Sequence, residues 1–445
     1  MDFSQLPTFA STALTKLNTE GYEAYLVGGC VRDILRGVTP HDYDITTSAT
    51  PQQIKETFSS YRTIDTGIKH GTVTVLIDGE ALEITTYRTD GEYSDHRHPE
   101  SVAFTKSLTE DLARRDFTCN AVAYNPINGL RDPFGGCNDI KNGIIRCVGD
   151  PYKRFDEDAL RIMRALRFSA TLGWKIEENT HKAILDLCSD VKIVSSERIR
   201  SELLKLICGK DVLSVLMDYS KVICKVIPEL SKCVGFDQKS IHHIYTVYEH
   251  IAHVVEKTPA VPNIRFAALL HDVAKPVCVT EDDEGHRHFP NHGKIGADMA
   301  EQICKRLKFA NKDITYVYTL VLHHDDYPHR SRASVRKDIA CLGSVDIWRD
   351  MIDLRIADSR AKAPQAYGNE QLYYDTVISF ARDIIADGDC VFPEQLDLTG
   401  EELLARGYKG KAIGEALKSA YKKVLSGEIE NEKNALIEYI LSANN

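Results

Sequence analysis

Alternating apolar and polar residues, a pattern typical of β-strands, are concentrated in this chain before Asp150. Ala24–Val27, Thr72–Ile77 and Glu80–Tyr87 are short apolar or β-branched runs, and Asp78–Gly79 is typical of a two-residue hairpin turn. After Asp150, helical periodicity dominates. We therefore predict an α+β fold, in which a small head with a mixed sheet is followed by mostly helical domains.

The composition narrows the class of protein. At 445 residues the chain has room for about three or four domains. It has no apolar run near the roughly 18 residues of a membrane span, and its N-terminus does not resemble a signal peptide. The 12 cysteines include no C-x-x-C pair, which favours reduced thiols. We expect a cytoplasmic protein with no membrane contact, and the net charge of −10 argues against a uniformly basic surface.

The segment YLVGGCVRDILRGVTPHDYDITTS, residues 25–48, combines a glycine pair, an arginine and two aspartates. If His41–Thr47 is a strand, its period of two places Asp42 and Asp44 on one face. Two such carboxylates can share divalent cations such as Mg²⁺, which stabilise the attacking and leaving oxygens of phosphoryl transfer. A lone D-x-D pair also arises by chance on exposed strands, so the aspartates alone are weak evidence.

The neighbouring residues fit the same chemistry. Gly28 and Gly29 let the backbone approach a triphosphate closely, and Arg32 and the following helix supply positive potential. Alternation in the hairpin places Glu83 opposite Leu82, so Glu83 is a candidate third carboxylate.

This combination resembles the nucleotidyltransferase signature of the DNA polymerase β superfamily. In particular, it resembles the bacterial class II tRNA nucleotidyltransferases, which are the CCA-adding enzymes and their poly(A) polymerase relatives. The resemblance extends over several motifs in roughly the first half of the chain. It implies template-independent addition of C, C and A to the 3′ end of tRNA, with CTP, ATP and Mg²⁺ as reactants and cofactor.

The segment RRDFTCNA, Arg114–Ala121, resembles the motif of this family that binds the sugar and triphosphate. If the segment is helical, Asp116 and Asn120 lie on one face, so that Asp116 can accept from a ribose hydroxyl while Arg114 or Arg115 meets phosphate. The alternative is a helix start with solvated arginines.

Three further segments have weaker signals. DPFGG, residues 132–136, resembles the family's glycine-rich connection to the neck, although a plain turn explains it almost as well. The polar stretch Thr89–Phe104 is predicted to be a long loop, and the resemblance implies that Arg88 and Asp90 contribute to the switch from C to A addition. The helix predicted at Ser195–Ile207 resembles the neck helix and is expected to be structural.

The segment RFDEDALRIMRALRF, Arg154–Phe168, is predicted to be one amphipathic helix. Its apolar face comprises Ala159, Ile162, Met163 and Leu166. Its charged side comprises Glu157, Arg161 and Arg164, flanked by Asp158. A surface ion pair is the alternative explanation for Asp158 and Arg161. In the resembling family, E-D-x-x-R at this place is the protein template for the base, and Glu157, Asp158 and Arg161 match it.

Base chemistry supports that assignment. Cytosine and adenine each present an amino donor beside a ring-nitrogen acceptor, so Asp158 can accept from the amino group while Arg161 donates to the ring nitrogen. Uracil and guanine present the opposite pattern, and such a mismatch can cost on the order of 10⁴-fold.

A widely spaced set of His and Asp residues follows in the second half: His250, His271, Asp272 and Asp358. The set is similar to that of HD-superfamily phosphohydrolases, which implies a divalent metal site. His292 with His323 or His324 is a candidate second metal position, and Lys275 is expected near a phosphate. A buried histidine that satisfies a carbonyl is the alternative.

The predicted domains are a head (1–145), a neck (146–215), an HD domain (216–370) and a tail (371–445). Neck and tail are expected to hold tRNA by shape and phosphate contact, with His329–Lys337 as a candidate patch unless it is a solvated helix end. A poly(A) polymerase, a CC-only or an A-only enzyme shares every motif. An HD phosphohydrolase whose head senses nucleotides and an RNA-binding scaffold with an inactive head remain as alternatives, and the sequence predicts no oligomeric state.

Overall fold

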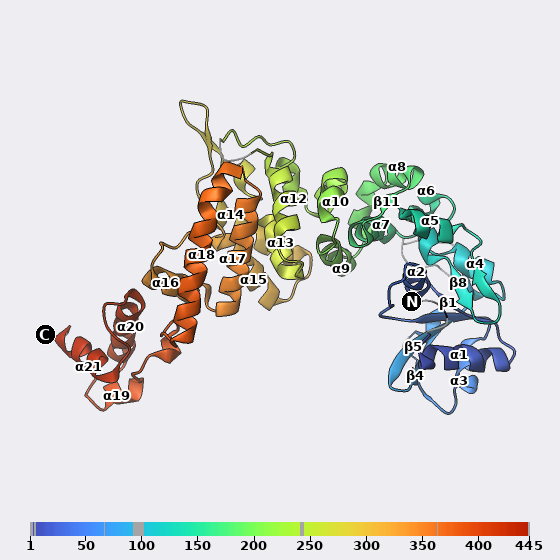
Figure 1. Ribbon diagram of the computed structural model, residues 1–445, viewed down its shortest axis with the longest axis horizontal. Coiled ribbons are helices and arrows are strands. Elements are labelled where there is room, and N and C mark those ends of the chain that lie inside the picture. The colour runs from blue at the N-terminus through green and yellow to red at the C-terminus, as the bar shows by residue number, and fades with distance from the viewer. Residues whose placement is uncertain are drawn as a thin grey trace. The chain divides into compact units, whose positions relative to one another are not determined.

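The computed structural model describes residues 3, 6–65, 67–91, 102–240, 244–362 and 364–443. The chain forms two compact units, Met1–Pro228 and Glu229–Asn445, which are described separately below (Figure 1). The finer division into head, neck, HD domain and tail stays a prediction.

The first unit contains a seven-stranded mixed sheet in the order β3-β4-β5-β2-β1-β8-β9. The strands are β1 (Ala24–Val27), β2 (Asp44–Thr47), β3 (Arg62–Ile64), β4 (Thr72–Ile77), β5 (Glu80–Thr86), β8 (Ala123–Asn125) and β9 (Gly129–Arg131). Only β2 and β5 pair in parallel, and the other neighbours are antiparallel. Asp78 and Gly79 both have positive φ, as expected for the tight hairpin turn. The predicted α+β head with a mixed sheet is therefore confirmed.

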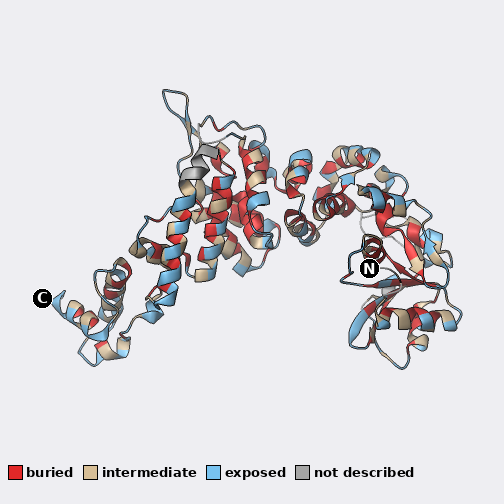
Figure 2. Cartoon of the chain, in the orientation of Figure 1, coloured by how far each residue is buried: buried red, intermediate tan, exposed pale blue. Residues whose placement is uncertain are grey.

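The helices of the head cover this sheet. They are α1 (Thr8–Thr19), α2 (Gly29–Leu35), α3 (Pro51–Thr57), α4 (Leu108–Ala113) and α5 (Gly136–Asn142). Helix α3 begins at a capping box formed by Thr50 and Gln53. All four residues of β1 are buried, so this strand lies in the core of the head (Figure 2).

The long loop predicted at Thr89–Phe104 is wrong at both ends. Strand β6 (Arg88–Asp90) pairs antiparallel with β7 (Val102–Phe104). Residues 92–101, the middle of that predicted loop, lie outside the described residues.

Helices complete the first unit. They are α6 (Pro151–Glu157), α7 (Leu160–Leu172), α8 (Glu178–Asp186), α9 (Ser196–Ile207), α10 (Val212–Asp218) and α11 (Ser220–Val226), and a short parallel pair joins β10 (Ile144–Ile145) to β11 (Lys175–Ile176). The single helix predicted over Arg154–Phe168 is wrong, because the chain is extended at Asp158 (φ −146°, ψ 101°). The Asp158 carboxylate accepts from the Leu160 N–H at 3.1 Å and so starts a new helix.

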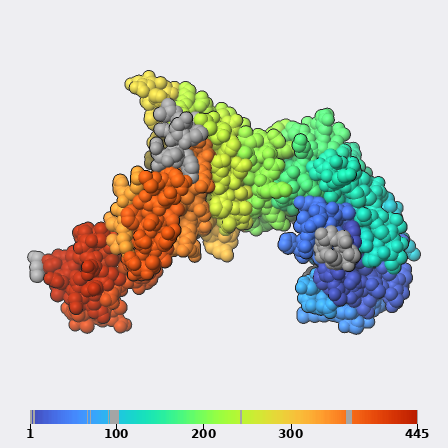
Figure 3. Space-filling model, viewed as in Figure 1, coloured from blue at the N-terminus to red at the C-terminus, as the bar shows by residue number. Residues whose placement is uncertain are grey.

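The second unit is almost entirely helical. Its helices are α12 (Val247–Lys257), α13 (Pro262–Leu270), α14 (His292–Arg306), α15 (Asn311–His323), α16 (Arg332–Leu342), α17 (Val345–Arg360) and α18 (Pro364–Ala386). A two-stranded hairpin pairs β12 (Thr280–Glu281) with β13 (Arg287–His288). Helices α19 (Gly400–Leu404), α20 (Lys411–Ser426) and α21 (Lys433–Ser442) share a small apolar core and form a compact lobe, red in Figure 3. None of the helices in the described ranges has the length and apolar character needed to cross a bilayer.

Two arginines of the candidate phosphate patch at residues 329–337 have structural partners. Arg332 donates to Asp387 and Asp389, and Arg336 donates to Asp389. These ion pairs join α16 to the turn that follows α18, so the two guanidinium groups are engaged within the unit.

The DPFGG segment positions α5 against the RRDFTCNA motif. The Asp132 carboxylate accepts from the N–H groups of Gly136 (2.7 Å) and Cys137 (2.8 Å) and so caps α5. A Cβ atom at Gly136 would lie 2.1 Å from the Thr118 carbonyl oxygen and 2.5 Å from Val122 Cγ2. Glycine is therefore required by close backbone packing at this position.

Gly136→Ala should lower the free energy of unfolding of the first unit by about 1–3 kcal/mol, since the methyl group has no room. Calorimetric unfolding of the full chain measures this change. Gly414→Ala in α20 is the control, because a Cβ there would have no neighbour within 4 Å and should be neutral or slightly stabilising. Wild-type stability of Gly136→Ala would contradict the packing argument.

Candidate active site and metal centre

Strand pairing brings the candidate carboxylates and the glycine turn together. The parallel register of β2 and β5 sets Asp44 beside Glu83, and the antiparallel register of β1 and β2 sets Asp44 beside Val27, next to the glycine turn. Glu83 is exposed on the face of β5 opposite buried Leu82 and Ile84, and Asp44 is the one exposed residue of β2. A Cβ at Gly28 would lie 3.3 Å from Arg115 Nη1 and 3.9 Å from Asp44 Oδ2. Four of the predicted site residues thus meet at one place.

A strand was predicted at His41–Thr47, but β2 begins only at Asp44. Residues 41–43 do not pair with β1 and so lie outside the strand. Desolvation by surrounding protein and then the Glu83 carboxylate raise the pKa of Asp44; Arg115 opposes this shift, and Asp42 adds to it. Crowded carboxylates of this kind are typical of sites that bind cations. Asp42, Asp44 and Glu83 do not form a group tight enough for one ion in the described part of the chain, so their role as metal ligands stays a prediction.

The glycine turn continues into α2. Gly28 has φ +76° and ψ −135°, a conformation that requires glycine, and Gly29 is already the first residue of the helix. Arg32 is buried, and its guanidinium donates to Asp33 at 3.0 Å and to the Asn120 side-chain oxygen at 2.9 Å. The first two motifs are therefore joined directly through Arg32 and Asn120.

The helix predicted over Arg114–Ala121 is wrong. Helix α4 ends at Ala113, and Thr118–Asn120 forms only a short 3₁₀ turn, because Phe117 is extended and forms a β-bridge with Cys147. Asp116 and Asn120 nevertheless meet, with the Asn120 amide donating to Asp116 Oδ1 at 3.1 Å.

Asp116 is bound by an arginine from α7. Arg164 Nε donates to Asp116 Oδ2 at 2.8 Å. Burial opposes ionisation, but Arg164 and the Asn120 amide lower the pKa of Asp116 to about 2. Asp116 is thus a stable, buried anion.

Sequence reasoning missed Asp111. This fully buried carboxylate lies 2.8 Å from Arg114 Nη2 and 3.5 Å from Arg115 Nη2, and it accepts from the Thr46 hydroxyl at 3.1 Å. It therefore ties both candidate phosphate-binding arginines to β2. Asp111 precedes Arg114 and Arg115 by three and four residues, a spacing that allows ion pairs on a helix. This spacing was the signal in the sequence that could have identified Asp111.

The Asp158 and Arg161 side chains have different partners, unlike the surface ion pair that the sequence left open as the alternative. Arg161 donates to Glu157 at 2.7 Å and to the Arg114 carbonyl oxygen at 3.1 Å. The second Asp158 oxygen accepts from Arg198 of α9 at 2.8 Å. The break between α6 and α7 separates the two side chains, so each has its own partners.

Helix α9 also carries Glu202, which was not predicted to matter. Glu202 is buried and lies 2.6 Å from Arg167 Nε and 4.0 Å from Arg164 Nη1. A helix that was expected to be structural therefore contacts side chains on α7 that face the candidate nucleotide site. Its expected apolar stripe, Ile199, Leu203 and Leu206, is buried as well.

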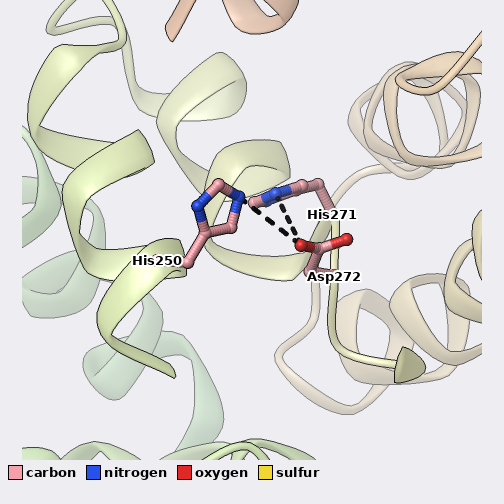
Figure 4. A group of neighbouring side chains, drawn as sticks. All are labelled: His250, His271 and Asp272. Atoms are coloured by element: carbon pink, nitrogen blue, oxygen red, sulfur yellow. Dashed lines mark ion pairs between the residues drawn. The ribbon is translucent and has the colours of Figure 1, made fainter. Parts of the chain in front are cut away.

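The second unit brings the four predicted HD ligands together, from α12, the end of α13, and α17. His250 Nε2 lies 2.8 Å from Asp358 Oδ1 and 3.5 Å from Asp272 Oδ2. His271 Nε2 lies 3.3 Å from the same Asp272 oxygen, and Figure 4 shows both imidazoles facing this carboxylate. His250, His271 and Asp272 are close enough to bind one metal ion.

A second group shares Asp272. Its other oxygen lies 3.6 Å from His292 Nε2 and 3.7 Å from His324 Nε2, and these three residues could also hold an ion. Of the two histidines left open by the sequence, His324 is therefore the one in place. His323 instead contacts Asp326 at 2.7 Å.

The electrostatics of this cluster fit cation binding. Asp272 and His271 are buried, yet both Asp272 oxygens and His271 Nε2 have no hydrogen-bond partner of good geometry. Such buried groups are rarely left unsatisfied without a reason. Burial opposes ionisation of Asp272, but Lys275 (2.7 Å away) and His271 hold its pKa well below the usual range. The cluster opens into a cavity of about 630 Å³, whose lining includes four cationic side chains: Lys275, Arg287, Lys294 and Lys362.

Family models match three stretches of the chain. These are the poly A polymerase head domain (residues 24–146), the probable RNA and SrmB-binding site of polymerase A (173–233) and the HD domain (240–363).

Curated relatives include the CCA-adding enzyme of Leuconostoc mesenteroides, 51% identical over 212 residues, and that of Lactobacillus helveticus, 53% identical over 200 residues. These matches cover 47% and 45% of this chain, and 52% and 50% of the relatives. The chain thus spans about half the length of the curated relatives it matches.

Solved structures match over nearly the whole chain. The CCA-adding enzyme of Bacillus stearothermophilus in complex with CTP has a TM-score of 0.72 and 28% identity, covering 98% of this chain and 97% of that one. The Thermotoga maritima CCA-adding enzyme complexed with tRNA has a TM-score of 0.62 at 21% identity, covering 100% and 97%, which supports the fold alone. The chain is therefore similar to poly A polymerase heads over residues 24–146 and to HD domains over residues 240–363, and its fold is similar to that of a solved CCA-adding enzyme.

Proposed function

We propose that this protein builds or repairs the 3′ CCA end of tRNA, adding C, C and A from CTP and ATP with release of pyrophosphate. The main support is the meeting of Gly28, Asp44, Glu83 and Arg115 beside the three central strands of the sheet. The proposal also draws on similarity to proteins named CCA-adding enzymes, one of them solved with CTP.

In the proposed site, Asp42 and Asp44 hold Mg²⁺, with Glu83 as a third carboxylate. When bound, this metal stabilises charge at the attacking RNA 3′ oxygen, the α-phosphate and the departing pyrophosphate. Because Gly28 has no side chain, the backbone and Arg115 can both approach the triphosphate. Gly29 and Arg32 extend this phosphate-binding surface at the start of α2.

Two further pairs of residues select the nucleotide. Asp116 and Asn120 bind the sugar, and their mutual hydrogen bond fixes both side chains before the nucleotide arrives. Asp158 and Arg161 bind the pairing edge of the base. Arg164 holds Asp116 in its ionised form, so it acts on the sugar site through that residue.

Asp44→Asn should lower CTP incorporation into a tRNA transcript lacking CCA by on the order of 10³-fold, because the metal ligand loses its charge. Asp42→Asn should do the same. The matched control is Asp78→Asn in the hairpin turn, where asparagine tolerates the positive φ and activity should be unchanged.

The same assay separates the related activities. Transcripts that end before, within or just short of CCA are incubated with each nucleotide. Indefinite A tails would indicate a poly(A) polymerase, and extension of only some transcripts would indicate a CC-only or A-only enzyme. Full activity of Asp44→Asn would refute the metal role of Asp44, whereas no incorporation by the wild-type chain would leave an RNA-binding scaffold as the better hypothesis.

Asp158→Ala and Arg161→Ala should each relax base selection, admitting UTP and GTP, since each removes half of the hydrogen-bond pattern that cytosine and adenine match. Steady-state kcat/KM values for the four nucleotides measure this change. Retained selectivity for C and A in both variants would rule out the template role.

We propose a second activity for the HD domain, a divalent-metal phosphohydrolase. Asp272 lies between two groups of histidines that could each hold an ion, and the cavity lining sets lysines and an arginine beside these groups, where they could contact a phosphate ester. Lys275 is the candidate phosphate ligand closest to Asp272.

His271→Ala and His324→Ala should each lower the divalent metal content of the purified full chain, whereas His323→Ala and His288→Ala should not. Elemental analysis after dialysis measures this content. Asp272→Ala should abolish any phosphatase activity and leave nucleotide incorporation intact. Unchanged metal content in His271→Ala would overturn the metal site. Loss of hydrolysis but not of nucleotide incorporation in Asp272→Ala would exclude hydrolysis as the main activity.

The partners that follow are tRNA, CTP and ATP, with neck and tail as the proposed tRNA contacts. Such an enzyme works in the cytoplasm. All 12 cysteines are free of disulfides in the described structure, which is consistent with the reducing environment of the cytoplasm.

A further inference from the structure

One polar face of α9 contacts Asp158, which we propose for base binding, and two arginines of α7. Arg198 and Glu202 are four residues apart, so they lie on the same face of the helix. Arg198 Nη2 donates to Asp158 Oδ2 at 2.8 Å, and Glu202 lies 2.6 Å from Arg167 Nε. This face is polar, whereas the apolar stripe of the same helix is buried and packs α9 into the core.

The Asp158 carboxylate is held by two donors. One oxygen accepts from the Leu160 N–H at 3.1 Å, and the other accepts from Arg198 at 2.8 Å. A carboxylate has about four acceptor positions, so these two bonds fix its orientation and still leave acceptor positions for an incoming base. The Leu160 donor is backbone and cannot be removed without changing the helix, so Arg198 is the side chain that can set this orientation.

We infer that Arg198 is a positioning residue for base selection, acting through Asp158. This inference rests on the proposed role of Asp158 in reading the base. With both oxygens held, the carboxylate presents its remaining acceptor positions to an exocyclic amino group in one orientation. Without Arg198, the Asp158 carboxylate can rotate about its Cβ–Cγ bond and accept hydrogen bonds from water. The site then discriminates less between a base with an amino donor and a base with a carbonyl acceptor.

The burial of the two side chains favours positioning over packing. The Arg198 side chain is 25% exposed and that of Asp158 is 17% exposed, so the pair lies at the edge of the core. Removing Arg198 therefore leaves the apolar stripe of α9 intact. Lys205, on the same helix and exposed, offers a control that removes the same charge without contacting Asp158.

The test compares Arg198→Ala, Arg198→Lys and Lys205→Ala by kcat/KM for CTP, ATP, UTP and GTP on a tRNA transcript. Arg198→Ala should lower the preference for CTP over UTP by about 10–100-fold, the size expected for loss of a hydrogen bond to a charged group, with little change in thermal unfolding. Arg198→Lys should restore part of the preference, and Lys205→Ala should keep all of it.

The double variant Asp158→Ala/Arg198→Ala shows whether Arg198 acts through Asp158. It should be no less selective than Asp158→Ala alone, because the carboxylate that Arg198 holds is gone. If Asp158→Ala relaxes selection while Arg198→Ala does not, the inference is wrong and the proposed base role stands. If Arg198→Ala slows all four nucleotides equally, its role is structural and the inference is overturned. If Asp158→Ala itself keeps wild-type selection, the proposed base role fails, and the inference with it.

Discussion

The parallel pairing of β2 with β5 is the constraint on which the candidate transferase site depends. Asp44 and Glu83 are 39 positions apart in sequence, and only this register makes them neighbours. A shift of one residue would turn Glu83 into the core and Leu82 outward, so the buried face of β5 and the carboxylate pair are fixed together. The stability of the sheet therefore maintains both the desolvation of Asp44 and its like-charge contact with Glu83, which together raise the pKa of Asp44. The site stores electrostatic repulsion that a bound cation would relieve.

A series of polar contacts then connects the motifs. Arg32 contacts Asn120, Asn120 contacts Asp116, Asp116 contacts Arg164, and Arg164 approaches Glu202. Each member is buried or partly buried, so removing one leaves its neighbour with an uncompensated charge or polar group. For this reason the elements from α2 to α9 are expected to hold the nucleotide residues as one set. Close packing of Gly136 on the Thr118 backbone fixes the same set from the other side.

The sequence predicted the sheet hairpin and the glycine turn because local signals were sufficient: Asp78–Gly79 fixes its turn. The HD ligands are widely spaced, and their prediction came from the resemblance to HD-superfamily phosphohydrolases. It failed where tertiary contacts decide the backbone. Nothing near Asp158 in the sequence resembles a helix stop, since no glycine or proline occurs there. The helix nevertheless breaks, as the Asp158 side chain bonds to Leu160 and to a residue 40 positions away. Periodicity places side chains on faces, but it cannot foresee partners on another helix.

The HD cluster also contains a contact that the local sequence could not predict. The choice between His323 and His324 was open in the sequence, and the end of α15 decides it by turning His324 toward Asp272. Asp272 then has histidines facing each of its oxygens and Lys275 beside it. Burial of so many polar groups is costly unless charge compensates it. Lys275 pairs with Asp272 and Lys362 pairs with Asp358, so the two carboxylates of the cluster are compensated by two lysines of the chain. The ion binding that we propose would therefore satisfy the Asp272 oxygens and His271 Nε2, which lack hydrogen-bond partners, rather than balance a net charge.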